Sequence, residues 1–159
     1  MVKIEQSSWF EYSKERVLEM LSVAPLSVTV NEYPSLSYYF PEGIDKSKIV
    51  RYSLFHKTNR LQFLGIISSV SEDSVTVRLK EGPFRGFSAI HSFKRDGALT
   101  LCDDAFDFQG EQDSLHEILE QAKIYYNFES RAKAFEIYQK FQKEKVTGSF
   151  AAVQSNTAS

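Results

Sequence analysis

Residues 82–108 read GPFRGFSAIHSFKRDGALTLCDDAFDF, two alternating runs of apolar and polar residues on either side of Asp96-Gly97. An Asp-Gly pair between two such runs is a strong signal of a β-hairpin, because glycine adopts the positive φ that tight turns need. If Asp96 and Gly97 form the two-residue loop, Arg95 pairs with Ala98 across the hairpin. The stretch therefore predicts two long antiparallel strands.

Side chains alternate across a strand, so this register gathers a mostly aromatic set on one face of the hairpin. The set comprises Arg85, Phe87, Ala89, His91, Phe93, Thr100, Cys102, Asp104, Phe106 and Phe108. His91 is expected diagonal to Asp104, about 7–8 Å away between backbone positions, and Ala89 directly opposite the carboxylate. Such a face suits a buried core, and it equally suits the wall of a ligand pocket.

The composition indicates one globular domain. The chain has 159 residues, of which 42% are hydrophobic, and it is rich in large rings, with 13 Phe and 8 Tyr. A net charge of −2 leaves no basic stripe for phosphates, so we expect no nucleic-acid partner. No apolar run reaches the roughly 18 residues of a membrane span. The lone Cys102 excludes an internal disulfide and favours a cytoplasmic location.

The order of predicted elements is that of an α+β domain. A first strand over 3–12 precedes a short helix that Ser13 would cap, and residues 27–31 also have a strand-like pattern. Five strands then follow in a meander, over 49–57, 61–70, 74–81, 85–95 and 98–108. One long helix is predicted from Ser114 to about Lys145. The domain is expected to span residues 1–145, with a disordered tail over 146–159.

These elements, together with the motif at 82–93, resemble the START-like or SRPBCC superfamily, and within it the bacterial branch related to polyketide cyclase/dehydrase-like proteins. Gly82-Pro-Phe and His91-x-Phe93 match that branch as they stand, and Thr100, Asp104, Phe106 and Phe108 match its return strand, with Phe108 in place of a Tyr at its end. Phe128-Glu-Ser-Arg131 resembles its F-x-x-R. Phe87 replaces a Trp of the pattern, and Ala89 replaces the first of two His residues.

The resemblance implies a helix-grip fold, in which a curved antiparallel sheet wraps around the long C-terminal helix. It also implies that a small hydrophobic ligand, such as a lipid, polyketide or terpenoid, binds between the two, without a cofactor. The residues expected to line the site are Arg85, Phe87, His91, Phe93, Asp104, Phe106, Phe108, Tyr125, Phe128, Arg131 and Ala132. Arg85 and Arg131 could each meet a ligand carboxylate or Asp104.

An enzyme and a protein-interaction module are the alternatives to a ligand-binding protein. In a cyclase, dehydratase or isomerase, His91 would be the general base and Asp104 would orient it. We favour a structural role, in which the two polar groups satisfy each other in the interior and fix the hairpin, because the predicted register makes them diagonal and not directly opposed. The three histidines fall on different elements, without carboxylates or cysteines at ligand spacing, so no metal site is expected. The sequence leaves the oligomeric state open.

Overall fold

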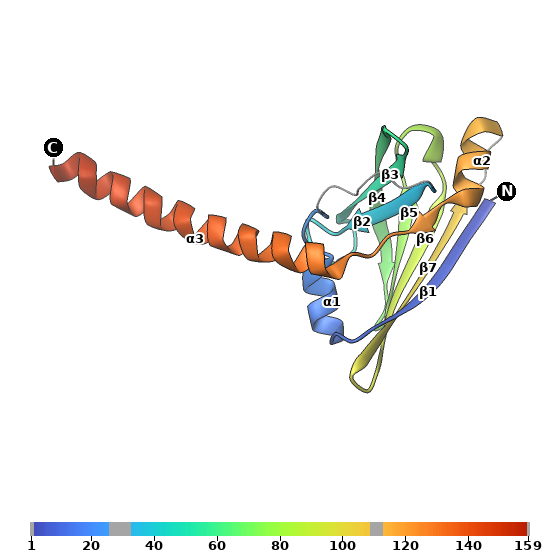
Figure 1. The fold of residues 1–159 in the computed structure, drawn as a ribbon, viewed down its shortest axis with the longest axis horizontal. Coiled ribbons are helices and arrows are strands. Elements are labelled where there is room, and N and C mark those ends of the chain that lie inside the picture. The colour runs from blue at the N-terminus through green and yellow to red at the C-terminus, as the bar shows by residue number, and fades with distance from the viewer. Residues whose placement is uncertain (1, 26–32, 109–112, 159) are drawn as a thin grey trace.

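The computed structural model describes residues 2–25, 33–108 and 113–158, and its described part centres on one strongly curved eight-stranded sheet (Figure 1). The strands are β1 (Val2–Phe10), β2 (Ser35–Tyr39), β3 (Ile49–His56), β4 (Asn59–Val70), β5 (Ser74–Leu79), β6 (Ser88–Asp96), β7 (Leu99–Phe108) and β8 (Lys123–Ile124). The helices are α1 (Lys14–Met20), the 3₁₀ turn η1 (Gly82–Phe84), α2 (Asp113–Gln121) and α3 (Phe128–Ala158).

The sheet has the order β1-β7-β6-β5-β4-β3-β2-β8. Neighbouring strands are antiparallel except β2 and β8, which run parallel. The five predicted meander strands correspond to β3–β7, and Ser13 caps α1 by accepting a hydrogen bond from the backbone of Arg16 at 3.1 Å. The sequence missed β2 and β8. The strand-like residues 27–31 lie outside the described residues.

The central hairpin forms, but its predicted register is wrong by two residues. Asp96 pairs with Leu99, so Gly97 and Ala98 make the loop. Gly97 has φ +61°, whereas neither Asp96 nor Ala98 has a positive φ. A two-residue turn of this kind places glycine at the first of its two loop positions. The loop is therefore one residue later than predicted, and each residue of one strand pairs two positions further along the other. A shift by two preserves the faces of both strands, so the predicted inward set stays inward.

The two ends of the sheet meet, and Gln6 of β1 joins them. Its side-chain Nε2 donates to the carbonyl of Ile124 at 2.9 Å, and its Oε1 accepts from the amide of the same residue at 3.0 Å. The amide side chain thus makes the pair of bonds that a neighbouring strand would make, and it satisfies the exposed edge of β8. The curved sheet is thereby closed into an almost complete barrel (Figure 1).

Aromatic rings from the strands and from the turn η1 fill the space inside the sheet. Tyr52 stacks on Phe63 at 5.1 Å between centroids, and Phe63 stacks on Phe84 at 4.1 Å. Phe106 and Phe108 stack at 5.6 Å, and all of these rings are buried. The rings pack against one another as a core does, which accounts for the high aromatic content of the sequence.

The single long helix predicted over 114–145 is wrong, because α2 and α3 are separate. Residues 122–127 leave the helical path, and Lys123 and Ile124 pair with β2 instead. The Asn127 side chain then accepts a hydrogen bond from the amide of Ser130 at 2.9 Å, as an N-cap of α3. The helix α3 continues past residue 145, and the division into a domain and a tail stays a prediction.

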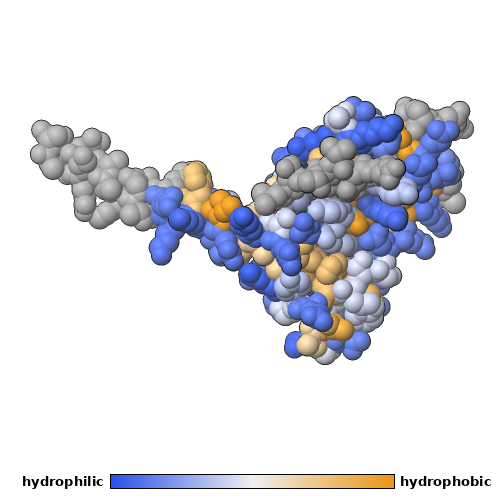
Figure 2. Space-filling model, in the orientation of Figure 1, coloured by the Kyte–Doolittle hydropathy of each residue, from blue (hydrophilic) through white to orange (hydrophobic). Residues whose placement is uncertain are grey.

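The predicted helix-grip class is confirmed, but most of α3 does not lie within the sheet. Its first turns are held by the buried Phe128, Arg131 and Ala134, and beyond them the helix extends away from the sheet (Figure 1). Ile137 and Phe141 are 56% and 61% exposed, and an orange patch marks this part of the helix in Figure 2. The helix α3 cannot lie deeper inside the curved sheet, because aromatic rings occupy the concave side of that sheet. Among the described residues, no helix is long and apolar enough to cross a membrane.

Candidate functional site

The site is centred on Asp104, which lies on the inner face of β7 directly opposite His91 of β6. The Nδ1 atom of His91 is 2.7 Å from Oδ1 of Asp104, and both side chains are fully buried. The diagonal separation predicted from the sequence is therefore wrong. The corrected register also moves Ala89 away from the carboxylate and places it opposite Phe106.

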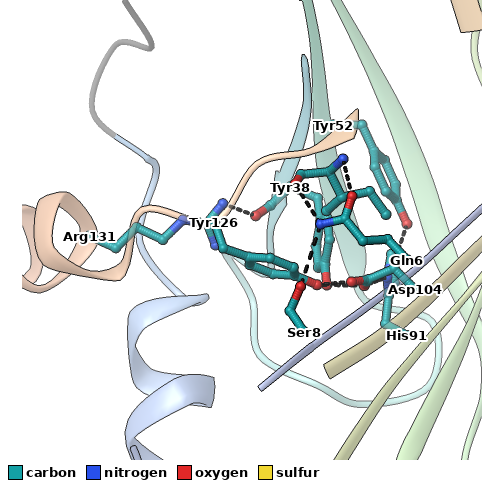
Figure 3. A network of polar contacts seen from close by, with 9 residues as sticks. Gln6, Ser8, Tyr38, Tyr52, His91, Asp104, Tyr126 and Arg131 are labelled. Carbon is teal, nitrogen blue, oxygen red and sulfur yellow. Dashed lines mark hydrogen bonds and ion pairs between the residues drawn. The ribbon is translucent and has the colours of Figure 1, made fainter. Parts of the chain in front are cut away.

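Two tyrosine hydroxyls donate the remaining hydrogen bonds to this carboxylate (Figure 3). Tyr38 of β2 donates to Oδ1 of Asp104, and Tyr126, which follows β8, donates to Oδ2. The two hydroxyl oxygens lie 2.8 Å apart. Both carboxylate oxygens thus accept hydrogen bonds, as a buried carboxylate requires.

A third tyrosine, Tyr52, extends the network on the far side of the imidazole. The hydroxyl of Tyr52 lies 2.9 Å from Nε2 of His91, so Tyr52, His91 and Asp104 form a continuous chain. The ring of Tyr38 also stacks on the imidazole, with 4.0 Å between centroids. The imidazole is therefore fixed by two polar contacts at its nitrogens and by one ring on its face.

The surroundings hold the hydroxyls of Tyr38 and Tyr52, and the nearby thiol of Cys102, in their protonated forms. Burial, reinforced by the nearby charge of Asp104, raises the pKa of Tyr38 and of Tyr52 well above the usual value. Burial and the same carboxylate raise the pKa of the Cys102 thiol to about 12. Each tyrosine can therefore donate its proton to a hydrogen bond at neutral pH, whereas the thiol is no nucleophile.

Arg131, on the first turns of α3, brings a positive charge into the same interior. Its Nη2 donates to the carbonyl of Tyr38 at 2.8 Å, whereas its buried Nε and Nη1 have no partner in the described part of the chain. Burial lowers the pKa of this guanidinium to about 10. Tyr38 thus links the guanidinium of Arg131 to the carboxylate of Asp104, since its backbone carbonyl accepts from Arg131 and its hydroxyl donates to Asp104.

A pocket of about 310 Å³ opens beside Tyr126, where β1 ends and α3 begins. It is lined by Phe10, Tyr12, Tyr125, Tyr126, Asn127, Phe128 and Glu129. Tyr126 is half-buried, so its ring faces the pocket while its hydroxyl reaches the buried carboxylate. This residue forms the wall between the pocket and the network.

The structure divides the residues expected at the site into four groups. His91, Asp104 and Arg131 lie in or beside the network, and Tyr125 and Phe128 line the pocket. Phe87, Phe93, Phe106 and Phe108 are part of the buried aromatic core, and Ala132 packs against that core. Arg85 follows η1 on the surface, because Gly86, with φ +90°, turns the chain before β6 begins.

The sequence analysis missed the part of the site that comes from Gln6 and Phe10 of β1 and from Tyr12, which follows it. No spacing within one segment brings these residues to Tyr126, since only the closure of the sheet does so. Asn127 carried a usable signal, because Asn followed by Phe128-Glu129 is typical of a helix start. That signal would have divided the predicted long helix in two and shown that the segment carrying Tyr126 lies before the second helix. Among the described residues, no group of His, Cys, Asp and Glu is placed to hold a metal ion.

Three solved structures are similar to this chain, and the first of them, with a TM-score above 0.5, supports the fold described above. A crystal structure of TTHA0849 from Thermus thermophilus is 13% identical and covers 85% of this chain and 94% of that one, with a TM-score of 0.51. The solution structure of an AHSA1-like protein from Aeromonas hydrophila is 13% identical over 84% and 93% of the two chains, with a TM-score of 0.49. Major latex-like protein 151 from Panax ginseng is 15% identical over 71% and 82%, also with a TM-score of 0.49.

At these identities the likeness concerns the fold alone. No protein-family model and no curated protein sequence matches the chain. The order of elements, the curved sheet and the C-terminal helix together identify the START-like, helix-grip fold. The narrower resemblance to the polyketide cyclase-related branch stays a prediction.

Proposed function

We propose that this protein binds a small ligand with an apolar body in the pocket between the end of β1 and the start of α3. The observation that carries the proposal is the position of Tyr126, whose ring lines the pocket and whose hydroxyl bonds to Asp104. Small-molecule sites are typically apolar hollows with a few fixed polar groups, and this pocket has that character. The expectation of a cytoplasmic location is part of the same proposal.

The proposed site differs from the one expected between the hairpin face and the long helix. The hairpin face is occupied by stacked rings, so a ligand there would have to displace the core. The pocket needs no such displacement, because its lining residues are half-buried or exposed apart from Phe128. The start of α3 still forms one wall, as the resemblance implies.

A thermal-shift screen of small lipids, polyketides and terpenoids tests this function. A ligand at 100 times its Kd stabilises the folded state by about 2.7 kcal/mol, which raises the Tm by about 5–10 °C in a domain of this size. Phe10→Ala removes one pocket wall and is expected to abolish the shift. Leu99→Ala, on a partly exposed residue of β7 outside the pocket, is the control and leaves the shift intact. No shift from any compound would contradict the proposal.

A catalytic function is the second candidate, and the Tyr52–His91–Asp104 chain is the observation that favours it. The imidazole is fully buried, so Tyr126 would have to swing out before a substrate could reach it. Mass spectrometry after incubation distinguishes the two functions. Conversion of a bound compound by the native protein, and its loss in a folded His91→Asn variant, would establish catalysis. Recovery of the unchanged compound supports binding alone.

A protein-interaction function is favoured by one further feature, the apolar side of α3. Ile137, Tyr138 and Phe141 are each at least 50% exposed, beyond the point where the helix leaves the body. Residues this apolar cluster at interfaces more often than on free surfaces. Sedimentation over a range of concentrations tests whether two copies associate through this face. Association that Phe141→Lys removes would support the idea, and a monomer at all concentrations would contradict it.

A further inference from the structure

We propose that the ligand of the Tyr126 pocket carries an organic cation, such as a substituted ammonium group, on its apolar body. The inference rests on the proposed function and specifies the chemical class of the ligand. It follows from three features of the pocket: the arrangement of its rings, the signs of the charges around it, and the hydrogen bond between Tyr126 and Asp104.

Five aromatic residues line the pocket, and four of their rings pack against one another in different orientations. Phe10 stands perpendicular to Phe128, at 89° with 4.3 Å between centroids, and Tyr126 is inclined to Phe128 by 24° at 5.3 Å. Tyr12 approaches Phe128 from another side, at 66° and 6.0 Å. Because these rings are not all parallel, we infer that both ring faces and ring edges border the pocket. Ring faces are electron-rich and attract a cation within about 6 Å of the centroid.

The charges around the pocket have the sign that a cation requires. Glu129 supplies an exposed carboxylate to the lining, and no lysine, arginine or histidine is part of that lining. Arg131 lies close by on α3, but its guanidinium is directed to the carbonyl of Tyr38 inside the molecule. An anionic ligand would therefore meet Glu129 without a compensating partner, whereas a cation would pair with it.

The buried carboxylate acts on the pocket through Tyr126. A phenol that donates its proton to a carboxylate is polarised, because the hydrogen bond shifts electron density from the hydroxyl oxygen into the ring. The ring of Tyr126 is consequently a better cation acceptor than that of an unpaired tyrosine. This gives the network of Tyr38, His91 and Asp104 a role in ligand recognition without any direct contact with the ligand.

The volume limits the size of the cationic group. A space of about 310 Å³ is at the lower end of the range for small-molecule sites, and it accommodates a trimethylammonium or benzylammonium group with a short chain. A longer apolar body would extend along the surface past Phe10. The pocket therefore recognises the head of the ligand rather than the whole molecule.

The test compares choline with 3,3-dimethylbutan-1-ol, which has the same shape but a carbon atom in place of the charged nitrogen. The Kd of each is measured by the NMR shifts of the backbone amides of residues 125–129. We expect choline to bind about tenfold more tightly, since a partly desolvated cation–π contact contributes that factor. Glu129→Gln is expected to weaken choline binding about three- to tenfold and to leave the alcohol unaffected.

Two further variants complete the design. Phe10→Leu retains an apolar wall but removes a ring face, so it should weaken choline more than the alcohol. Glu136→Gln, an exposed position on α3 outside the pocket, is the matched control and should change neither Kd. Equal binding of the two probes would overturn the cationic class while the pocket stands as a binding site. Binding of neither probe, with no shift in the lining residues, would overturn both the class and the site.

Discussion

Asp104 is the residue on which the polar interior of this protein depends. A buried carboxylate is costly unless its oxygens accept hydrogen bonds, and this one accepts from Tyr38, Tyr126 and His91. These partners come from strands β2 and β6 and from the segment after β8, so one side chain joins parts of the chain that are distant in sequence. The same arrangement keeps the network buried, and for this reason we propose ligand binding before catalysis.

We expect Asp104→Asn to destabilise the protein by about 3 kcal/mol or more. An amide nitrogen at the position of one oxygen would face a tyrosine or imidazole donor, and breaking a buried charged network on one side costs about this much. The free energy of unfolding in urea measures the effect. Asp103→Asn is the control, because that half-exposed carboxylate accepts from Ser7 on the outer face, and we expect a cost below about 1 kcal/mol. Equal losses in both variants would contradict this role of Asp104.

Among the elements, β4 shows how the backbone makes room for the network. Gly65 lies on the inner face of β4, between Val50 of β3 and Leu79 of β5. A Cβ atom there would lie 2.4 Å from Cγ1 of Val77 and 3.1 Å from Cε2 of Tyr52. The absence of a side chain at this position allows the Tyr52 ring to lie flat across the strand. The Tyr52 hydroxyl can then reach Nε2 of His91.

Gly65→Ala is accordingly expected to destabilise the protein by about 1–3 kcal/mol, the usual cost of overpacking a core. The displaced Tyr52 ring should also lose its bond to the imidazole, which changes the NMR signals of the His91 ring. Ser69→Ala, at an exposed position of the same strand, is expected to remain within about 0.5 kcal/mol of the native protein. An unchanged His91 spectrum in Gly65→Ala would refute the link between this glycine and the site.

At the scale of the whole molecule, closure of the sheet determines both the core and the site. The bonds from Gln6 to Ile124 bring β1 beside β8, and the segment after β8 then crosses the open end of the curved sheet. This crossing places Tyr126 over Asp104 and forms the pocket with Phe10. The extended part of α3 takes no part in the closure, and its apolar side remains exposed.

The stability of the whole molecule should fall as the pH rises above about 9. The pKa of the Cys102 thiol is raised from 9.0 to about 12 in the folded state, and the pKa values of Tyr38 and Tyr52 are also raised. The unfolded chain loses the thiol proton above about pH 9 and the two tyrosine protons above about pH 10, while the folded chain keeps them. The folded state then binds more protons, so the free energy of unfolding decreases by about 1.4 kcal/mol per pH unit for each group.

Urea unfolding between about pH 8 and 10 measures this slope. The range stops at pH 10 because the pKa of Arg131 is lowered to about 10. Above that pH, Arg131 has the opposite effect on the free energy of unfolding. Cys102→Ala has no thiol to ionise, and it should reduce the slope in the upper half of this range. A slope that is identical in the variant would show that the thiol is not buried as described.

The sequence by itself determined the α+β class, the five meander strands and the inward faces of the hairpin, because alternation and turn residues are local signals. It also singled out His91, Asp104 and Arg131. The faces stayed correct despite the wrong register, since a shift of two residues preserves the side on which each side chain lies. The error arose at Gly97, where the type of turn, and not the presence of glycine, sets the pairing.

Only the tertiary structure decided how the chemistry of the site is assembled. The direct pairing of His91 with Asp104, the two tyrosines on the carboxylate, and the pocket all depend on contacts between residues up to 118 positions apart. The break between α2 and α3 has the same origin, because pairing of Lys123 and Ile124 with β2 outweighs the helical pattern of their neighbours. Such contacts leave no periodic trace in the sequence, since they arise only when the sheet curves and its two ends meet.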